Sequence, residues 1–189
     1  MTQLGLPRST LVAALLFYSG TAGAEVQKIM TPCGGEKLCA SFQLVLTPPD
    51  GWVLDRKATR ENKVQIIVPN GEDFATAPAL IYVQVFYHPD KQQTLADFAR
   101  VSNERWQAAA GNAKISELDA VERSNGKPGF LRFAYQNPSK AQQAYEVGAF
   151  GVDADKDGNE FMLDVVMTGS DKAALDRADK DYVAFLKAH

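Results

Sequence analysis

Short runs of β-branched and aromatic residues, separated by turn-forming residues, occupy most of the chain and predict a sheet. Residues 41–47 alternate apolar and polar positions and lead into a Pro-Pro-Asp-Gly turn, and residues 64–68 end at Pro-Asn-Gly. Residues 80–87 lack this alternation, which predicts a central strand covered on both faces. We expect further strands over residues 114–122, 130–135, 144–152 and 160–168.

Two other stretches repeat their apolar positions at helical spacing. The first opens at a capping box, Thr94 with Asp97, and ends at the Gly-Asn pair 111–112, and the second opens at the Ser-Asp pair 170–171. We interpret Trp106 on the first helix as a core residue, with a platform for a ligand as the alternative. The two apolar stripes are Leu95, Phe98, Ser102, Trp106 and Ala109, and Leu175, Ala178, Tyr182, Phe185 and Leu186.

The Asp-Gly pair 157–158 is the strongest hairpin signal in the chain. A two-residue turn at this pair places Phe150 opposite Val165 and puts Asp164 on the other face. Both faces of the hairpin are then mainly apolar, so both need to be covered. The sequence therefore predicts an α+β fold, in which a mostly antiparallel sheet is covered by helices on both faces as an α/β/α sandwich.

The first 24 residues have the features of a secretory signal. Arg8 supplies a positive charge, residues 11–18 form an apolar run, and Ala22-Gly23-Ala24 gives the small-residue pattern of a cleavage site. A membrane-anchoring helix is the alternative, but the apolar run is far shorter than the roughly 20 residues that span a bilayer. We therefore predict a signal peptide over residues 1–24, a single domain over residues 25–189, and a periplasmic location.

Composition and charge narrow the classes of function. The 189 residues include 46% hydrophobic residues and carry a net charge of −3, so there is no basic excess of the kind that nucleic-acid binding requires. No apolar run after the leader approaches transmembrane length. Nucleophile-elbow, phosphate-loop and zinc-protease motifs are absent, and we interpret His88 as a surface loop residue and His189 as a frayed terminus. The sequence predicts a protein that is not an enzyme and holds no cofactor.

Cys33 and Cys39 bracket a short segment that contains two glycines. Two cysteines this close in an exported protein usually form a disulfide, which we predict here. The alternative is a free or metal-bound pair, for which Glu36 is the one further ligand nearby.

Arg132 and Asp164 are charged residues inside otherwise apolar strands. A charge on a covered face of a sheet needs a partner. We expect Arg132 and Asp164 to form an ion pair with each other or with Glu146, and the alternative is that these residues line a pocket.

The predicted hairpin tip carries Asp153, Asp155 and Asp157, which match the first positions of a calcium-binding EF-hand loop. The residue that closes such a loop would be Asp164, one methylene shorter than the usual Glu. The flanking segments also have the period of strands rather than of helices. We therefore interpret the aspartates as a solvated hairpin tip and expect calcium to bind no tighter than the millimolar range.

The run Phe42-x-Leu44-x-Leu46 followed by Pro-Asp-Gly-Trp52 is similar to the PsbP-like α/β/α sandwich superfamily, and specifically to its exported bacterial DcrB-like members. The resemblance extends over about residues 40–188 and includes the strand at 64–71, the two helices and the hairpin at 153–160. It implies a non-catalytic accessory or binding role and transfers no catalytic residue.

Three functions follow from these observations. The first is an exported, non-catalytic accessory or partner-binding protein, of the chaperone, inhibitor or assembly-factor type, whose partner is another exported or envelope protein. The second is a periplasmic module that binds a small ligand or a metal. The third is a hydrolase whose catalytic residues are dispersed along the sequence.

Overall fold

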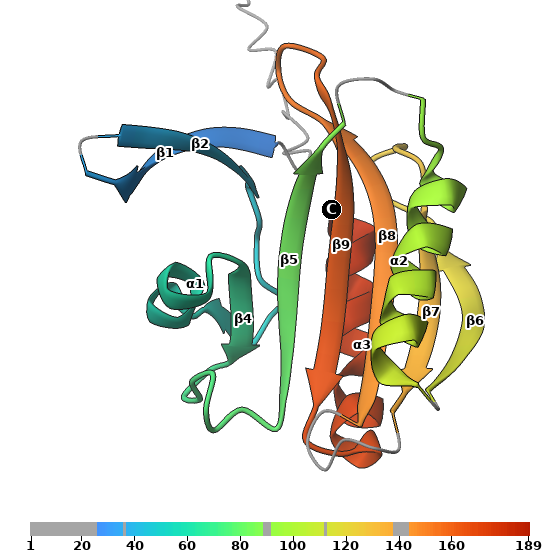
Figure 1. Cartoon of the computed structure of the whole chain (residues 1–189). Coiled ribbons are helices and arrows are strands. Elements are labelled where there is room, and N and C mark those ends of the chain that lie inside the picture. Colours follow the sequence, from blue (N-terminus) through green and yellow to red (C-terminus); the bar gives the residue numbers. More distant parts are fainter. Residues whose placement is uncertain (1–25, 36, 89–91, 112, 138–143) are drawn as a thin grey trace, which may run out of the picture.

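The computed structural model describes residues 26–35, 37–88, 92–111, 113–137 and 144–189, which form a mixed α+β fold. The described residues form nine strands and three helices. Figure 1 labels most of these elements. The strands are β1 (Val26–Gly34), β2 (Lys37–Leu44), β3 (Trp52–Leu54), β4 (Gln65–Pro69), β5 (Ala79–Tyr87), β6 (Lys114–Val121), β7 (Phe130–Gln136), β8 (Tyr145–Ala154) and β9 (Glu160–Gly169), and the helices are α1 (Arg56–Asn62), α2 (Leu95–Ala110) and α3 (Lys172–Ala188).

Seven of these strands form one antiparallel sheet in the order β3-β4-β5-β9-β8-β7-β6. β9 lies at its centre, paired along its whole length with β5 on one side and β8 on the other. The predicted α+β class with a mostly antiparallel sheet is confirmed, and the predicted strands from residue 64 onward all occur with bounds that differ by at most a few residues.

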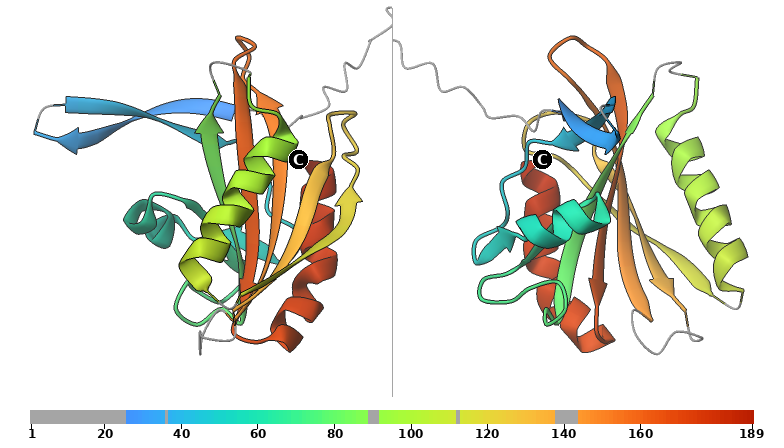
Figure 2. Two further views of the ribbon diagram at one scale, coloured as in Figure 1. Left: turned by 45° about the vertical axis from the view of Figure 1, so that its right-hand side comes forward. Right: turned by 60° about the vertical axis from the view of Figure 1, so that its left-hand side comes forward.

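α3 packs on one face of this sheet and forms the main core with it (Figure 2). The apolar stripe predicted for this helix is fully buried. Tyr182 has no exposed surface, and its hydroxyl donates to the carbonyl of Val165 at 2.7 Å. The N-cap is Asp171, whose carboxylate accepts from the N–H of Ala174 at 2.7 Å.

α2 lies on the opposite side of the sheet from α3 (Figure 2). The predicted capping box is confirmed, with Thr94 accepting from the N–H of Asp97 at 3.1 Å. Phe98 contacts Phe150 and Phe86, and Trp106 contacts Tyr135 with ring centroids 4.9 Å apart. Ala99 is the one buried residue of this helix, whereas α3 has six.

The β8–β9 hairpin has a different register from the predicted one. Phe150 lies opposite Asp164, and residues 155–159 form a longer connection than two residues. Asp155 closes this turn, because its carboxylate accepts from the N–H groups of Asp157 and Asn159, each at 2.9 Å. Since side chains alternate along a strand, this change of one residue moves Phe150 to the face that Asp164 occupies. The predicted two-residue turn is wrong.

The strands β1 and β2 form a separate hairpin that projects from the body of the molecule (Figure 1). Its register runs from Val26 opposite Leu44, at the base, to Gly34 opposite Lys37, near the tip. The base is fixed in the main core, where Val26 and Leu44 are both buried. The sequence pattern predicted neither β1 nor the extension of β2 to Lys37.

Candidate partner-binding groove

The strand β5 is paired on both edges only over the first half of its length. On the side of β4 the ladder contains three pairs and ends where Gln65 lies opposite Val83. Before Gln65 the chain turns away at Lys63, which has a left-handed backbone (φ 57°) and connects β4 to α1. Within the described residues, no strand pairs with residues 84–87 on this edge, although β2 lies near it and Phe42 stacks on Tyr87. We call this unpaired C-terminal half of β5 its open edge.

The hydrogen bonds nearby indicate which backbone groups point to the open edge. The N–H of His88 donates to the carbonyl of Glu160, the first residue of β9, at 3.0 Å, so the backbone of His88 points toward β9. In an antiparallel sheet both backbone groups of a residue point to the same side, and the side alternates along the strand. Gln84 and Phe86 therefore bond to β9. Val85 and Tyr87 direct their N–H and C=O groups toward the open edge.

The backbone of β4 supports this assignment. The carbonyl of Ile66 accepts from the N–H of Asp55 at 2.8 Å, and its N–H donates to the hydroxyl of Thr59 at 3.0 Å. Both bonds point away from β5, so Gln65 and not Ile66 is the residue that bonds to Val83. Val83 is two residues before Val85, and the two residues share one edge.

The open edge forms one wall of a groove of about 710 Å³. The projecting hairpin forms a second wall, and the end of α1 with the residues that follow it forms a third (Figure 1). The lining residues are Ile29, Cys33, Cys39, Ala40, Ser41, Phe42 and Gln43 from the hairpin, Thr59, Arg60, Lys63, Val64 and Gln65 from α1 and β4, and Val83, Gln84, Val85 and Phe86 from β5.

The groove combines apolar walls with positive charge. Among the apolar lining residues Phe86 is 42% exposed, and Ile29, Phe42 and Val85 also line the groove. Among the described lining residues, Arg60 and Lys63 are the charged ones and none is an acid, although the chain as a whole carries a net charge of −3. The chemistry of this surface suits an apolar segment that also carries negative charge.

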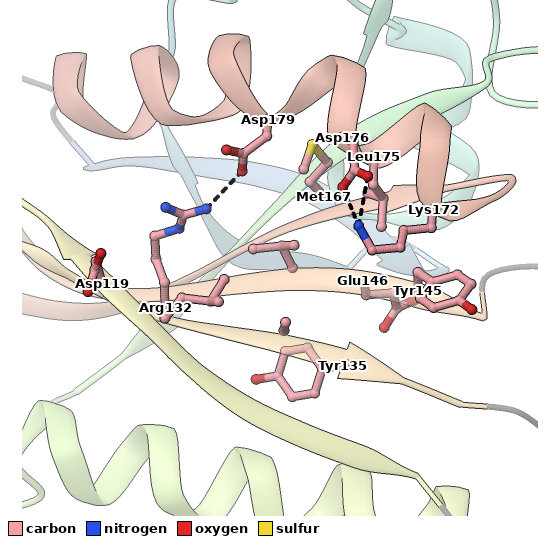
Figure 3. Close-up of a pocket in the computed structure, with 13 residues that line it drawn as sticks. Asp119, Arg132, Tyr135, Tyr145, Glu146, Met167, Lys172, Leu175, Asp176 and Asp179 are labelled. Atoms are coloured by element: carbon pink, nitrogen blue, oxygen red, sulfur yellow. Dashed lines mark hydrogen bonds and ion pairs between the residues drawn. The ribbon is translucent and has the colours of Figure 1, made fainter.

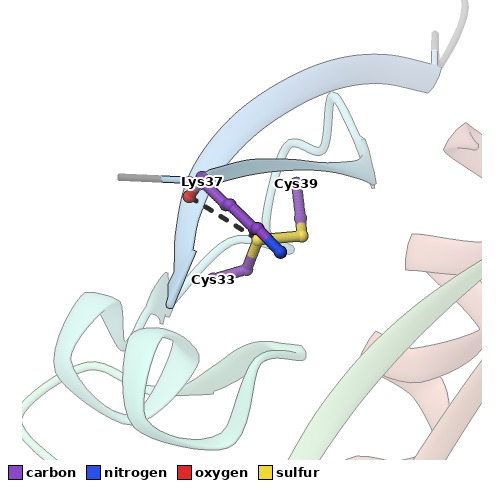
Figure 4. The surroundings of a disulfide bond; sticks show 3 residues. All are labelled: Cys33, Lys37 and Cys39. Carbon is purple, nitrogen blue, oxygen red and sulfur yellow. Dashed lines mark hydrogen bonds between the residues drawn. A yellow bond between two sulfur atoms is a disulfide. The ribbon is translucent and has the colours of Figure 1, made fainter. Parts of the chain in front are cut away.

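The hairpin is attached to the edge of β5 by aromatic contacts. The ring of Phe42 stacks on Tyr87 with centroids 5.5 Å apart and contacts Phe161 at 4.8 Å. At the other end of the hairpin Cys33 and Cys39 form a disulfide, and the carbonyl of Lys37 lies 3.6 Å from the sulfur of Cys33 (Figure 4). A two-stranded hairpin alone is only marginally stable in water. The aromatic contacts fix the hairpin to β5, and the disulfide, which joins β1 to β2, stabilises the hairpin itself.

Arg132 lies at a second hollow, of about 450 Å³, between α3 and strands β7 and β8. Figure 3 shows Arg132 reaching toward Asp179 of α3, with which it forms an ion pair at 2.8 Å. Lys172 forms a similar pair with Asp176 at 2.7 Å. Arg132 and Lys172 are thus each paired with an aspartate of α3. This hollow is therefore less suited to an anionic ligand than the groove beside β5.

The predicted ion pair of Arg132 with Asp164 or Glu146 does not form. Arg132 lies opposite Ala149, and Ala149 lies opposite Val165, so the side chains of all three are on one face of the sheet. Asp164, the residue before Val165, is therefore on the opposite face. The side chain of Glu146 is on that opposite face too. The physical reason is that side chains alternate between the two faces of a strand, and the predicted hairpin register, which is wrong by one residue, assigned residues of β8 and β9 to the wrong shared face.

Asp164 occupies a buried position opposite Gln84 of β5. Burial raises the pKa of its carboxyl to about 7, and the negative charge of Glu146 adds to this shift. No described group donates to its buried Oδ1 atom. The carboxyl of Asp164 is therefore protonated in about half of the molecules at pH 7 and in more of them below it, which lowers the cost of an unpaired buried charge.

The three aspartates of the β8–β9 hairpin have separate environments. Asp153 is buried and pairs with Arg123 at 2.8 Å and with Lys127 at 2.5 Å. Asp155 closes the turn, and Asp157 is exposed at the tip. Over the part of the chain that the structure describes, no group of three or more His, Cys, Asp and Glu side chains is arranged to hold a metal ion. Asp153 is a buried ion-pair residue and not part of a solvated tip, which corrects the prediction for this residue.

Both histidines are buried, contrary to their prediction as surface residues. The Nδ1 atom of His88 lies 3.2 Å from a carboxylate oxygen of Glu160. The Nε2 atom of His189 accepts from the N–H of Thr47 at 2.9 Å, and its Nδ1 donates to the carbonyl of Phe185 at 2.9 Å. His189 therefore fixes the end of α3 to the segment that follows the projecting hairpin.

The predicted signal peptide, residues 1–24, lies outside the described residues. None of the described helices is both long and apolar enough to cross a membrane.

The sequence patterns missed the residues that build the groove, although two signals were present. Asp55 precedes the helix-forming run of α1 and caps it by accepting from the N–H groups of Lys57 and Ala58, at 3.1 and 2.9 Å. Gly34 and Gly35 both have positive φ and form the turn of the projecting hairpin. An N-cap residue and a Gly-Gly pair between two apolar runs are the signals that could have identified α1 and β1.

Comparisons with known proteins give a similarity in three dimensions to a solved structure. No protein-family model and no curated protein matches the chain. Among solved structures, the chain is similar to the solution structure of cyanobacterial PsbP (CyanoP) from Synechocystis, with 14% sequence identity, 82% of this chain and 96% of that chain covered, and a TM-score of 0.42. The finer assignment to DcrB-like proteins stays a prediction.

Proposed function

We propose that this chain is an exported, non-catalytic accessory protein that binds another exported or envelope protein in the groove beside β5. The observation that carries the proposal is the open edge of β5 at Val85 and Tyr87, where Val85 and the exposed Phe86 line the groove. Open strand edges invite pairing with another chain, and proteins usually protect them. Here the edge is accessible between two walls that would orient an incoming segment.

The rest of the fold serves this site as a support. In this proposal α3 and α2 cover the two faces of the sheet as an α/β/α sandwich, so that β5 is held rigidly by β9. The projecting hairpin and α1 then act as the two sides of a clamp. The proposed periplasmic location is supported by the disulfide Cys33–Cys39, because such bonds persist in oxidising compartments.

The experiment that tests this function is site-specific photo-cross-linking in the periplasm of the producing cell. A benzoylphenylalanine replaces Phe86 at the groove, and in a matched variant it replaces Phe74, which is equally exposed but lies in the loop between β4 and β5. We expect a discrete protein adduct at position 86 and none at position 74. Equal labelling at both positions, or no adduct at position 86, would contradict the proposal.

A further inference from the structure

We propose that the partner segment is an extended strand that adds to β5 at Val85 and Tyr87 and carries acidic side chains toward Arg60 and Lys63. This inference rests on the proposed function, because it specifies the chemistry of the partner at the same groove. It follows from three features of the groove: its unpaired backbone groups, its length, and the sign of its charge.

The backbone groups require an extended partner. Val85 and Tyr87 each direct a backbone N–H and C=O toward the open edge. This is the same edge of β5 on which Val83 pairs with Gln65. A helix has already used its own backbone groups and cannot bond to such an edge, whereas a strand satisfies them at every second residue. The incoming strand would continue the line of β4, from which the chain departs at Lys63.

The length of the open edge sets the size of the segment. Residues 84–87 are unpaired on this side, which at the usual rise of a strand is roughly 13 Å. A segment of four to six residues matches this length. Its side chains would alternate between the side of Phe86 and the side of Phe42, so two apolar positions in alternation suit the walls.

The charge of the walls selects an acidic segment. Arg60 and Lys63 line the groove, and neither takes part in the ion pairs that the described residues form. An acidic side chain on the incoming strand would supply the missing partner for each cation. Opposite charges across an interface contribute to specificity and to the rate of association more than to affinity.

The test uses random twelve-residue peptides displayed on phage and selected on the immobilised mature chain. The enriched peptides are then made with a fluorescein label and titrated by anisotropy. Three proteins are compared: the native chain, the charge-reversed pair Arg60→Glu with Lys63→Glu at the groove, and the control pair Arg56→Glu with Lys57→Glu. The control residues lie on the same helix, outside the lining of the groove.

We expect enriched peptides with alternating apolar residues and at least one Asp or Glu. Their affinity should fall about tenfold on the groove variant and stay within about twofold on the control. N-methylation of every second backbone amide should abolish binding in one of the two possible sets and spare it in the other, because only one edge of the peptide faces β5. Equal effects of the two sets, or no preference for acidic peptides, would overturn the inference.

Cross-linking of each labelled peptide to benzoylphenylalanine at position 86 separates the two proposals. Peptides that react there but show neither the charge dependence nor the amide dependence overturn the strand inference and leave the proposed function standing. If no selected peptide reacts at position 86, both fail. Self-association that light scattering detects and Val85→Pro abolishes would assign the edge to a second copy of the chain. Binding to phosphatidylglycerol vesicles through Arg60 and Lys63 would assign it to anionic lipid, and either result would overturn the inference.

Discussion

The side chain of Gln65 bonds both backbone groups of Leu44: its Oε1 accepts from the N–H and its Nε2 donates to the carbonyl, each at 2.9 Å. An amide side chain thus takes the place of a strand backbone. The contact is buried and joins the base of the projecting hairpin to the residue at which the β4–β5 ladder ends. It fixes the position of the hairpin relative to the open edge of β5.

This contact predicts a specific effect of Gln65→Glu. A carboxylate still accepts from the N–H of Leu44 but cannot donate to its carbonyl, so one buried acceptor loses its partner and a charge is buried. We expect a loss of about 1–3 kcal/mol in the free energy of unfolding at pH 8, measured from urea denaturation. The loss should shrink at pH 4, where a protonated Glu can donate again.

The matched control is Gln27→Glu, an exposed position on β1 of the same hairpin. Its urea midpoint should stay close to that of the native chain at both pH values. If Gln65→Glu is as stable as this control at pH 8, the side chain does not hold the hairpin, and our description of the base of the groove is wrong.

Asp164 predicts a pH dependence of stability. Its raised pKa of about 7 means that the folded chain keeps the proton between about pH 4 and 7, whereas the unfolded chain, with the usual value of 3.8, has released it. The unfolded state therefore binds fewer protons in this window, and this group makes stability fall as pH rises from 4 to 7, with no further change above. Asp164→Asn should remove this fall and be the more stable protein at pH 8, by an amount on the order of 2–4 kcal/mol.

The control for this prediction is Asp157→Asn at the exposed tip of the β8–β9 hairpin. This substitution changes the net charge by the same amount but no buried group. Urea midpoints measured from pH 4 to 8 should follow the native chain for Asp157→Asn and flatten for Asp164→Asn. Parallel curves for all three proteins would show that the carboxyl of Asp164 is ionised without cost.

The disulfide and the predicted signal peptide together predict the covalent state of the chain. Intact mass of protein purified from the periplasm should correspond to a chain that begins at Glu25 and lacks two hydrogens, which reduction restores. Cys33→Ser with Cys39→Ser should loosen the projecting hairpin and lower stability by about 2 kcal/mol. A retained leader, or two thiols that react with an alkylating agent before reduction, would contradict this prediction.

The sequence patterns identified the elements whose local signals agree with their packing. The capping box of α2 and the stripe of α3 were read correctly, because helix caps and a 3.6-residue period leave clear traces in a sequence. The register of the β8–β9 hairpin was not, because Asp-Gly suits more than one turn length and the five-residue connection depends on how Asp155 folds back.

The groove itself depends on relationships that no local pattern contains. The open edge of β5 arises because the chain turns away from it at Lys63, 21 residues before Gln84, and neither residue type signals this event. The burial of His88 and His189 depends on contacts with Glu160 and Thr47, which are distant in sequence. Whether a histidine or a strand edge is exposed depends on the tertiary structure, so the periodicity of the sequence does not predict it.

The open edge of β5 is tested most directly by amide hydrogen exchange of four successive residues, measured by NMR. The account predicts alternation in the free protein: the amides of Gln84 and Phe86, bonded to β9, exchange slowly, and those of Val85 and Tyr87 exchange fast. A bound acidic peptide should protect Val85 and Tyr87 and leave the other two unchanged. Slow exchange of all four amides in the free protein would show that the edge is already occupied, and would contradict the central claim.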